Sequence, residues 1–308
     1  MSGTLRRSVA DYLAVRRSLG YKLARPEKLL AQFTAYLEQA GAVTVTTEHA
    51  LAWAVLPGSS DPSWHAYRLA VVRGFAAWLA TTDPAAEIPP AGLIPSRKQR
   101  ATPYLYTDGE LAALISAAES LRFPLRTATY QTLIGLLAVT GMRVGEAISL
   151  DRADADLDAG VLTVRNGKHG KSRLVPVHDT TAEALGEYLR LRDRLCPDAT
   201  TRAVLISPAG TRLLYCNVHA TWKKLTASAG LRPRSGSCRP RIHDLRHSFA
   251  VRTMLGAYES GLDGQATLAV LSTYLGHVDP KATYWYLTAS PELMAAAGQR
   301  LDAWLEQP

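Results

Sequence analysis

The sequence predicts a mainly α-helical protein in two domains, with one small antiparallel β-sheet in the second domain. Apolar residues recur every three or four positions through most of the chain, which is the period of an amphipathic helix. Two alternating segments flank a glycine-rich tip, as in a β-hairpin. A proline-dense stretch precedes residue 104, and 308 residues suit about two domains of ~100–200 residues each.

Residues 1–82 are expected to form a helical domain. Its helices are predicted at residues 5 to about 20, 29 to about 41, 47–56 and 64–79. Tyr67, Phe75 and Trp78 lie at helical spacing in the last helix, and we interpret this aromatic stripe as core rather than as a surface for stacking bases. The basic side chains left for the outer faces are Arg16, Arg17, Lys22, Arg25, Lys28, Arg68 and Arg73. They are either a solvated surface or phosphate contacts that hold a register on DNA.

Residues 83–103 are expected to form a semi-extended linker. Five prolines between residues 84 and 103 exclude a continuous helix there. The linker also carries the basic residues Arg97, Lys98 and Arg100. It is either a plain tether or a basic segment that contacts DNA.

Residues 104–308 form the second domain. A helix start signature at residues 107–110 opens it, and Gly141 ends the following apolar helix. Helices are predicted at 107–119, 125–140, 143–150, 180–195 and 216–229, with strands at 161–164, 173–177 and 204–206. The first two strands are joined by a hairpin turn that carries Lys168 and Lys171.

Composition limits the function. The net charge of +8 and the pI near 9.5 suit a polyanionic partner, and both domains are basic. No apolar run approaches the ~20 residues that span a bilayer, and charges near the N-terminus argue against a signal peptide. Three cysteines without C-x-x-C spacing predict reduced thiols rather than a disulfide or zinc site. We therefore expect a cytoplasmic, nucleoid-associated protein without a membrane partner.

The stretch from Arg239 to Tyr286 carries the chemistry. His243, Arg246 and His247 fall at i, i+3 and i+4, so they share one face of a helix. An imidazole beside a guanidinium on one exposed face suits a phosphodiester, because the forked donors of arginine match phosphate oxygens. His277 follows Leu275-Gly276, and Asp279-Pro280 predicts the start of a short helix that holds Tyr286.

These motifs resemble those of the tyrosine recombinases, the integrase family of site-specific DNA recombinases that includes the Xer-type enzymes. The matches are H-x-L-R-H at 243–247, L-G-H at 275–277 and a tyrosine nine residues beyond His277. Upstream, T-G-x-R-x-G-E at 140–146 and G-K-x-x-K-x-R at 167–173 resemble the family's first arginine box and its lysine turn. The amino-acid sequence of residues 271–293 resembles that of mobile-element recombinases more than that of housekeeping ones.

The resemblance implies the site and the roles of its residues. Arg143 and Arg246 would bind the phosphate, Tyr286 would attack it, and His277 would hydrogen-bond to it. His243 would accept the proton of Tyr286, and Lys168 would protonate the departing 5′ oxygen, with Lys171 as the rival for that role. Glu146 would fix Arg143, and His247 would either contact the phosphate or support the site from behind. DNA contacts are expected from Arg16, Arg17, Lys22, Arg68, Arg73, Arg97, Lys98, Arg100, Lys171, Arg173, Arg239 and Arg241.

The resemblance also implies the assembly. Two lobes, the N-terminal helical domain and the catalytic domain, would form a C-shaped clamp on double-stranded DNA. A homo- or hetero-tetramer on paired sites would exchange strands through a 3′-phosphotyrosine and a Holliday junction, with neither metal nor ATP. The terminal helix, residues 291–305, would dock into a neighbouring protomer or pack on its own domain. Between Arg246 and His277 the spacing is longer than the family pattern, which suggests an inserted loop at 256–264.

Other interpretations remain. Tyr284 is the rival nucleophile, but it lies nearly opposite Tyr286 on a helix, so both cannot face one phosphate. H-D-L-R-H resembles the H-E-x-x-H pair of zinc hydrolases, but Asp replaces Glu and an arginine sits between the histidines. A catalytically silent DNA-binding homologue and a type IB topoisomerase would share the same motifs.

Overall fold

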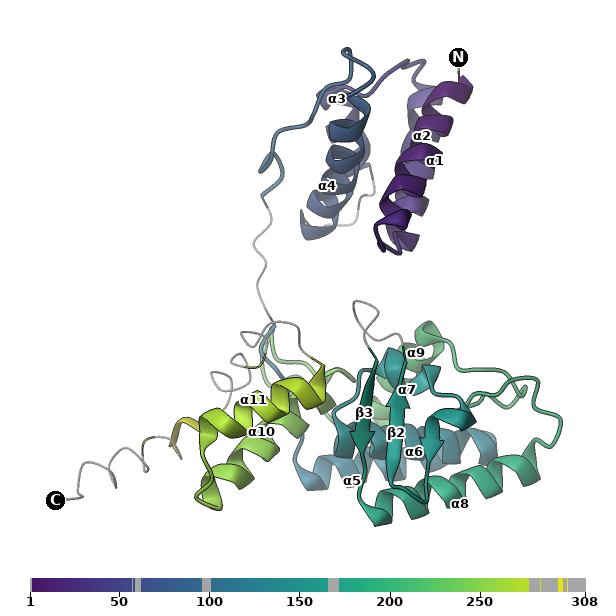
Figure 1. The fold of residues 1–308 in the computed structure, drawn as a ribbon, viewed down its shortest axis with the longest axis vertical. Helices are drawn as coiled ribbons and strands as arrows, with labels where there is room; N and C mark the ends of the chain where they lie inside the picture. Colours follow the sequence, from purple (N-terminus) through teal and green to yellow (C-terminus); the bar gives the residue numbers. More distant parts are fainter. Residues whose placement is uncertain are drawn as a thin grey trace. The chain divides into compact units, whose positions relative to one another are not determined.

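The computed structural model describes residues 2–56, 58, 62–95, 101–165, 172–276, 283, 293–295 and 298. The chain divides into two compact units, Met1–Arg100 and Ala101–Pro308, each with its own hydrophobic core (Figure 1). The division falls inside the stretch expected to be the linker. Within the described residues no helix has both the length and the apolar character needed to cross a membrane.

The first unit is built from four helices (Figure 1). They are α1 (Ser2–Ser18), α2 (Ala24–Gln39), α3 (Thr47–Val55) and α4 (Pro62–Leu79). The side chain of Thr46 begins α3 by accepting the backbone N–H of His49 at 3.2 Å, which satisfies one of the unpaired donors of the first turn. All four helices predicted from apolar spacing are confirmed, because that spacing marks the buried side of each.

The core of this unit is aromatic, and it takes in one of the expected surface arginines. Phe33 packs against Trp53 with ring centroids 5.1 Å apart. The Arg68 side chain, only 5% exposed as a residue, lies over the Trp53 ring at 3.6 Å, and its Nη2 donates to the Trp53 carbonyl at 2.7 Å. The expectation that Arg68 lies on an outer face is therefore wrong. Its position, one residue before the buried Leu69, turns it toward α3.

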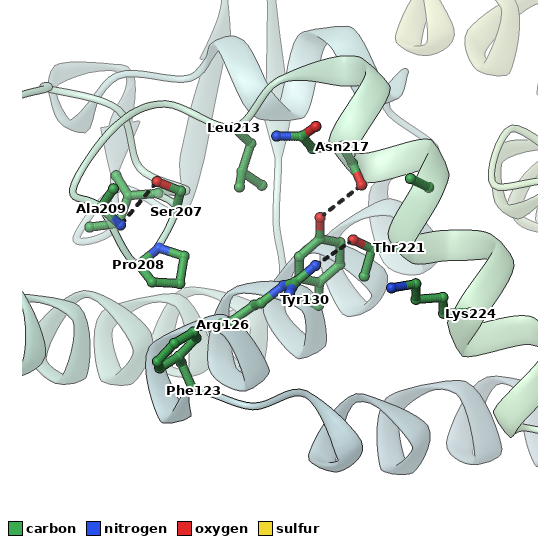
Figure 2. Close-up of a pocket in the computed structure, with 12 residues that line it drawn as sticks. Phe123, Arg126, Tyr130, Ser207, Pro208, Ala209, Leu213, Asn217, Thr221 and Lys224 are labelled. Atoms are coloured by element: carbon green, nitrogen blue, oxygen red, sulfur yellow. Dashed lines mark hydrogen bonds between the residues drawn. The ribbon is translucent and has the colours of Figure 1, made fainter.

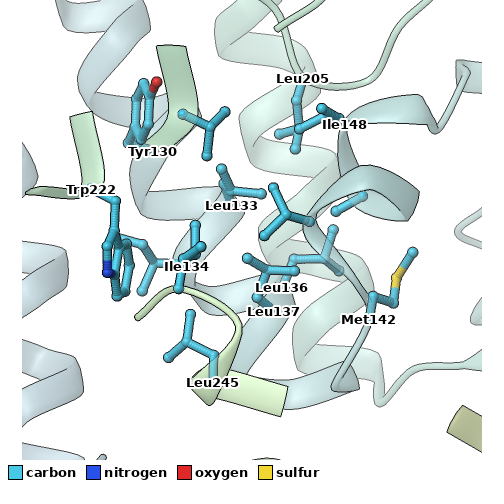
Figure 3. Close-up of a cluster of buried hydrophobic side chains, with 14 of the residues drawn as sticks. Tyr130, Leu133, Ile134, Leu136, Leu137, Met142, Ile148, Leu205, Trp222 and Leu245 are labelled. Carbon is cyan, nitrogen blue, oxygen red and sulfur yellow. The ribbon is translucent and has the colours of Figure 1, made fainter. Parts of the chain in front are cut away.

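The second unit is mostly helical (Figure 1). Its helices are α5 (Asp108–Ala117), α6 (Pro124–Thr140), α7 (Val144–Ser149), α8 (Asp179–Leu195), α9 (Tyr215–Ser228), α10 (Asp244–Glu259) and α11 (Gly264–Leu275), with short 3₁₀ turns at Ala118–Ser120 and Arg152–Asp154. Helix α6 packs against α5, α8 and α10. Figure 3 shows its Leu133 and Leu137 in one cluster with Trp222 of α9 and Leu245 of α10. The helix that precedes the first arginine box is thus fixed from several sides.

A three-stranded antiparallel sheet, in the order β1-β2-β3, completes this unit. Its strands are β1 (Ala155–Asp156), β2 (Val161–Val164) and β3 (Arg173–Pro176). Leu162 pairs with Val175, and both are fully buried, so the alternating residues set the register. The mainly helical fold with a small antiparallel sheet is confirmed. The strand expected at 204–206 is wrong: its residues are buried, but only isolated bridges form there, at Ala203 and at Ile206.

Helices α10 and α11 lie side by side and share a small core that includes Met254 and Leu271 (Figure 1). The insertion expected as a loop at 256–264 is largely wrong, because α10 continues to Glu259 and α11 begins at Gly264. Asp263 caps α11 by accepting the backbone N–H of Gln265 at 2.8 Å. Residues 256–264 therefore lie mainly at the ends of two packed helices, with a short turn between them.

Candidate active site

Arg143 is positioned by the sharp turn between α6 and α7. Gly141 ends α6 with φ +58°, a left-handed conformation that favours glycine. A Cβ at this position would lie 2.5 Å from Phe249 Cδ1, so the close approach of α10 also requires glycine here. The turn places Arg143 directly before the first residue of α7, at the edge of the packed core.

Glu146 holds Arg143 in place. Arg143 Nη1 donates to Glu146 Oε1 at 2.7 Å, and the Arg143 backbone N–H donates to Oε2 at 3.0 Å. Glu146 also accepts two bonds from Arg173, at 3.2 Å from Nη1 and 2.8 Å from Nη2. Burial acts to raise the pKa of Glu146, but the bonds from Arg173 and from the Arg143 backbone outweigh it and hold the pKa at about 2. This carboxylate is therefore ionised at any physiological pH.

Arg246 is buried, being only 1% exposed. Its Nη1 donates to the carbonyl of Gly141 at 2.8 Å, and its Nη2 donates to the carbonyl of Leu275 at 2.6 Å. These carbonyls belong to the C-terminal ends of α6 and α11, where helix dipoles favour a cation and carbonyls have no partner within the helix. The charge is thus compensated by backbone, and the sequence-based picture of an exposed guanidinium at this position is wrong.

His243 stands at the N-terminal end of α10 and is exposed. Partial desolvation and the positive charges of Arg246, Arg143 and Arg241 lower its pKa to about 4, against a smaller opposing effect of Glu146. Because His243 is exposed to water, we attribute the lowered pKa more to the three guanidinium charges than to desolvation. Their shared effect places Arg143, Arg246 and His243 in one neighbourhood, and it keeps the imidazole neutral at pH 7.

Behind His243 lies a buried carboxylate that the sequence alone did not single out. Asp244, fully buried, accepts from Arg241 Nε and Nη2, both at 2.9 Å. Burial raises its pKa, although the bonds and charge of Arg241 oppose the rise. His247 is buried, with Nε2 3.8 Å from Asp244 Oδ1 and its ring 5.3 Å from that of His243. Its place behind His243 suits a supporting role. The sequence feature that could have pointed to Asp244 is its position in the first turn of the predicted helix.

Several predicted site residues lie outside the described residues. They are Lys168, Lys171, Arg97, Lys98, Arg100, His277 and Tyr286, together with most of residues 291–305. The described motif residues Arg143, Glu146, His243, Arg246 and His247 come together although they are spread over more than 100 positions. The arrangement can bind an anionic oxygen centre between fixed cations, next to a neutral base.

The expected DNA contacts divide into exposed and internal arginines. Lys22, Arg17 and Arg239 are exposed, and Arg17 also pairs with Glu27 at 2.7 Å. Arg16 lies over the ring of Tyr21 at 4.1 Å, and Arg73 is partly buried. Arg173 is the internal one: its side chain is 14% exposed and its guanidinium group pairs with Glu146, whereas Arg241 pairs with Asp244 but stays 41% exposed. The residue type is the same in both groups, so sequence could not separate them.

A pocket of about 410 Å³ lies between the N-terminal half of α6, the loop at 206–213 and α9 (Figure 2). Arg126 crosses it and donates from Nη2 to the Thr221 hydroxyl at 2.9 Å, and Lys224 points toward it. Among the described residues, none of the motif residues lines this pocket. It is therefore separate from the candidate active site.

The second unit thus combines a mostly helical fold with a cluster of two arginines and a histidine whose chemistry suits an anionic group. Residues 105–292 match the model of the phage integrase family. The chain is 46% identical to a putative integrase/recombinase, y4rB, of Sinorhizobium fredii (strain NBRC 101917 / NGR234) over 305 residues, 97% of each chain. The chain belongs to the phage integrase family and is a tyrosine recombinase.

Other similarities agree with this placement. The chain is 28% identical to the tyrosine recombinase XerC of Vibrio cholerae over 286 residues, 89% of this chain and 85% of XerC. Two solved structures share the fold: a Tn1549 transposon integrase in complex with a circular intermediate DNA (TM-score 0.65, 15% identity, 96% of this chain and 99% of that one), and a lambda integrase tetramer bound to a Holliday junction (TM-score 0.57, 21% identity, 92% and 76%).

Proposed function

We propose that this chain is a site-specific DNA recombinase that cuts and rejoins strands through a 3′-phosphotyrosine at Tyr286. The phenolic oxygen attacks the phosphorus of one phosphodiester, and the bond from phosphorus to the 5′ oxygen breaks. His243 takes the phenolic proton, and Lys168 gives a proton to the departing 5′ oxygen. The covalent bond keeps the energy of the phosphodiester, so a 5′ hydroxyl of another strand reverses the step and completes the exchange.

The observation that supports this most strongly is that Arg246, on the helix that His243 begins, donates to the carbonyl of Gly141, two residues before Arg143. A phenol has an ordinary pKa of about 10, so it needs an acceptor for its proton and cations near the charge that develops. A pKa of about 4 keeps His243 able to accept a proton at pH 7. Arg143 and Arg246 supply fixed positive charge to the same region, so neither a metal ion nor a nucleotide is needed for charge neutralisation.

The arginines would stabilise the pentacoordinate transition state more than the ground state. Their donors are held by Glu146 and by two helix-end carbonyls, so little reorganisation accompanies the reaction. Loss of one such contact should cost ~3–4 kcal/mol of transition-state stabilisation, or about 10²–10³ in rate, by analogy with an oxyanion donor. His277 would add a hydrogen bond to the phosphate.

The relatives support the wider scheme. DNA and a Holliday junction appear in the solved complexes of the transposon and lambda integrases, the latter as a tetramer. The net charge of +8 suits a duplex DNA partner. We infer a tetramer on paired sites, with residues 1–82 gripping DNA and residues 291–305 exchanged between protomers. The Tn1549 likeness favours a mobile element as the natural substrate.

Replacement of the nucleophile tests the proposal. The protein is incubated with a pool of random duplexes that each carry a nick, and SDS-resistant adducts are recovered and sequenced, which also defines the cut site. Wild type and the control Tyr284→Phe should form adducts, whereas Tyr286→Phe should bind the selected DNA and form none. An adduct of normal yield from Tyr286→Phe, or none from the wild-type protein, would overturn the proposal.

A further inference from the structure

We propose that Arg173 is a positioning residue for DNA cleavage: it fixes Glu146, and through it Arg143, to the glycine turn that leads to His277. This inference rests on the proposed function. Sequence reasoning placed Arg173 among the DNA contacts, so its internal role is new information from the tertiary structure. Three elements far apart in the chain meet at this one guanidinium: α7, β3 and the end of α11.

Arg173 uses all three of its nitrogens on internal acceptors. Nη1 and Nη2 form a forked pair with the two oxygens of Glu146, at 3.2 and 2.8 Å. Nε donates to the carbonyl of Tyr274 at 2.8 Å, in the last turn of α11. The side chain is only 14% exposed. Each nitrogen of this guanidinium therefore donates to an acceptor within the protein.

The glycine of the L-G-H motif makes room for this contact. Gly276 has φ +67° and ends α11. A Cβ on it would lie 3.2 Å from Arg173 Nη1 and 3.3 Å from Arg173 Cδ. The turn before His277 is therefore packed directly on Arg173. A shift of Arg173 would move this turn and Glu146 together.

Arg173 also sets the charge that Arg143 presents. Glu146 accepts from both arginines, so two positive charges face one carboxylate. With Arg173 absent, Glu146 would pair with Arg143 alone, and the attraction of Arg143 for a phosphate would be largely cancelled at close range. Among the described residues, the side chain of Arg143 hydrogen-bonds to Glu146 through Nη1 only. Arg173 thus lets Glu146 orient Arg143 without neutralising it.

The experiment measures single-turnover adduct formation and DNA affinity on the duplex selected by the wild-type protein. Arg173→Met should lower the rate of adduct formation about 10- to 100-fold through loss of orientation. DNA affinity and its salt dependence should stay unchanged. A phosphate contact would instead lower the slope of log affinity against log salt by about 1.

Charge rescue separates positioning from plain support of the fold. Glu146→Gln combined with Arg173→Met removes the unbalanced carboxylate, so the double variant should react faster than Arg173→Met alone. A residue needed only for folding would show the opposite order, because the double variant loses more hydrogen bonds. Arg173→Lys keeps the charge without the forked geometry and should react at an intermediate rate. If Arg173→Met does not fold, Arg173→Lys replaces it in the same experiment.

Arg212→Met is the matched control. Arg212 also pairs with a carboxylate, Asp151 at 2.5 Å, and with the backbone carbonyls of Ile148 and Leu150, and none of these three partners is a motif residue. It should react at the wild-type rate. The inference is overturned if Arg173→Met reacts like wild type, if its salt slope falls, or if the double variant is slower than the single one. Absence of adducts with wild type would instead reject the proposed function.

Discussion

At the scale of single residues, His243 takes its chemistry from its neighbours. Arg246 belongs to its own helix, whereas Arg143 comes from a turn 100 positions earlier in the chain. Together with partial desolvation they lower the pKa of His243 to about 4. For Glu146 the neighbouring cations have the opposite result: they lower its pKa to about 2 and so keep the carboxylate charged. Each group thereby has the charge state that strand cleavage would need.

The first prediction concerns the titration of His243. NMR of histidine-labelled free protein should show its imidazole neutral down to about pH 5, and Arg143→Gln should raise its pKa, with Arg212→Gln as the unchanged control. Between pH 6.5 and 4 the unfolded chain binds a proton at this histidine that the folded chain does not. The stability contributed by the neutral form is therefore lost as pH falls through that window. Protonation of the wild-type residue near pH 6.5 would contradict the assignment.

The second prediction concerns the general acid. Lys168→Ala should block cleavage of ordinary DNA but cleave a substrate with a 5′-thio leaving group, because a thiolate departs without a proton. Gel analysis of adducts on the two substrates measures the difference. Lys171→Ala is the control and should cleave both. If the thio substrate does not restore cleavage by Lys168→Ala, the acid is another residue.

At the scale of elements, helix ends build the site. The C-terminal carbonyls of α6 and α11 hold Arg246, and the turn after α6 presents Arg143. The glycines that end these two helices both adopt positive φ and both lie against a side chain of the site or its support. The position of the cations therefore depends on how tightly α10, α6 and α11 approach one another.

The third prediction tests that close approach. Gly141→Ala should destabilise the protein by about 1–3 kcal/mol more than Gly230→Ala, as measured by urea unfolding. Both glycines have positive φ, +58° and +70°, so both variants bear backbone strain. Only at Gly141 would the new Cβ meet a neighbour, Phe249, whereas nothing lies within 4 Å at Gly230. Equal losses would show that backbone strain alone explains the glycine.

At the scale of the whole molecule, both units contain exposed arginines and arginines with internal partners. In the first unit Arg68 supports the aromatic core, while Arg17 is exposed and pairs with Glu27. In the second unit arginines brace carboxylates around the site. Near the end of the chain, Leu293 is 2% exposed and packs with α10 and α11. A truncation that tests assembly must therefore retain it.

The fourth prediction concerns assembly. Deletion of residues 297–308 keeps Leu293 and should leave adduct formation on a single site unchanged. It should abolish the complex that joins two sites, because a protomer would lose the segment offered to its neighbour. Native gels with one-site and two-site DNA measure both. A two-site complex of normal yield would show that residues 297–308 are not exchanged.

The amino-acid sequence by itself determined the family, the helices and the hairpin. Apolar periodicity and turn residues are local signals, and the motif order is read directly from the chain. Arg143, Glu146 and Arg246 could be named in this way because each stands in a short pattern. The predictions of a strand at 204–206 and of a loop at 256–264 were wrong, because local composition does not show which segments pair as strands or continue as helices.

Only the tertiary structure decided which charges face inward. Arg68 and Arg173 look like surface cations in the sequence, but Arg68 meets the ring of Trp53 and Arg173 meets the carboxylate of Glu146, each supplied by another part of the chain. The same holds for the lowered pKa of His243, which depends on Arg143 from another element. Desolvation and Coulomb interactions act through space, so they are fixed only when the helices have packed.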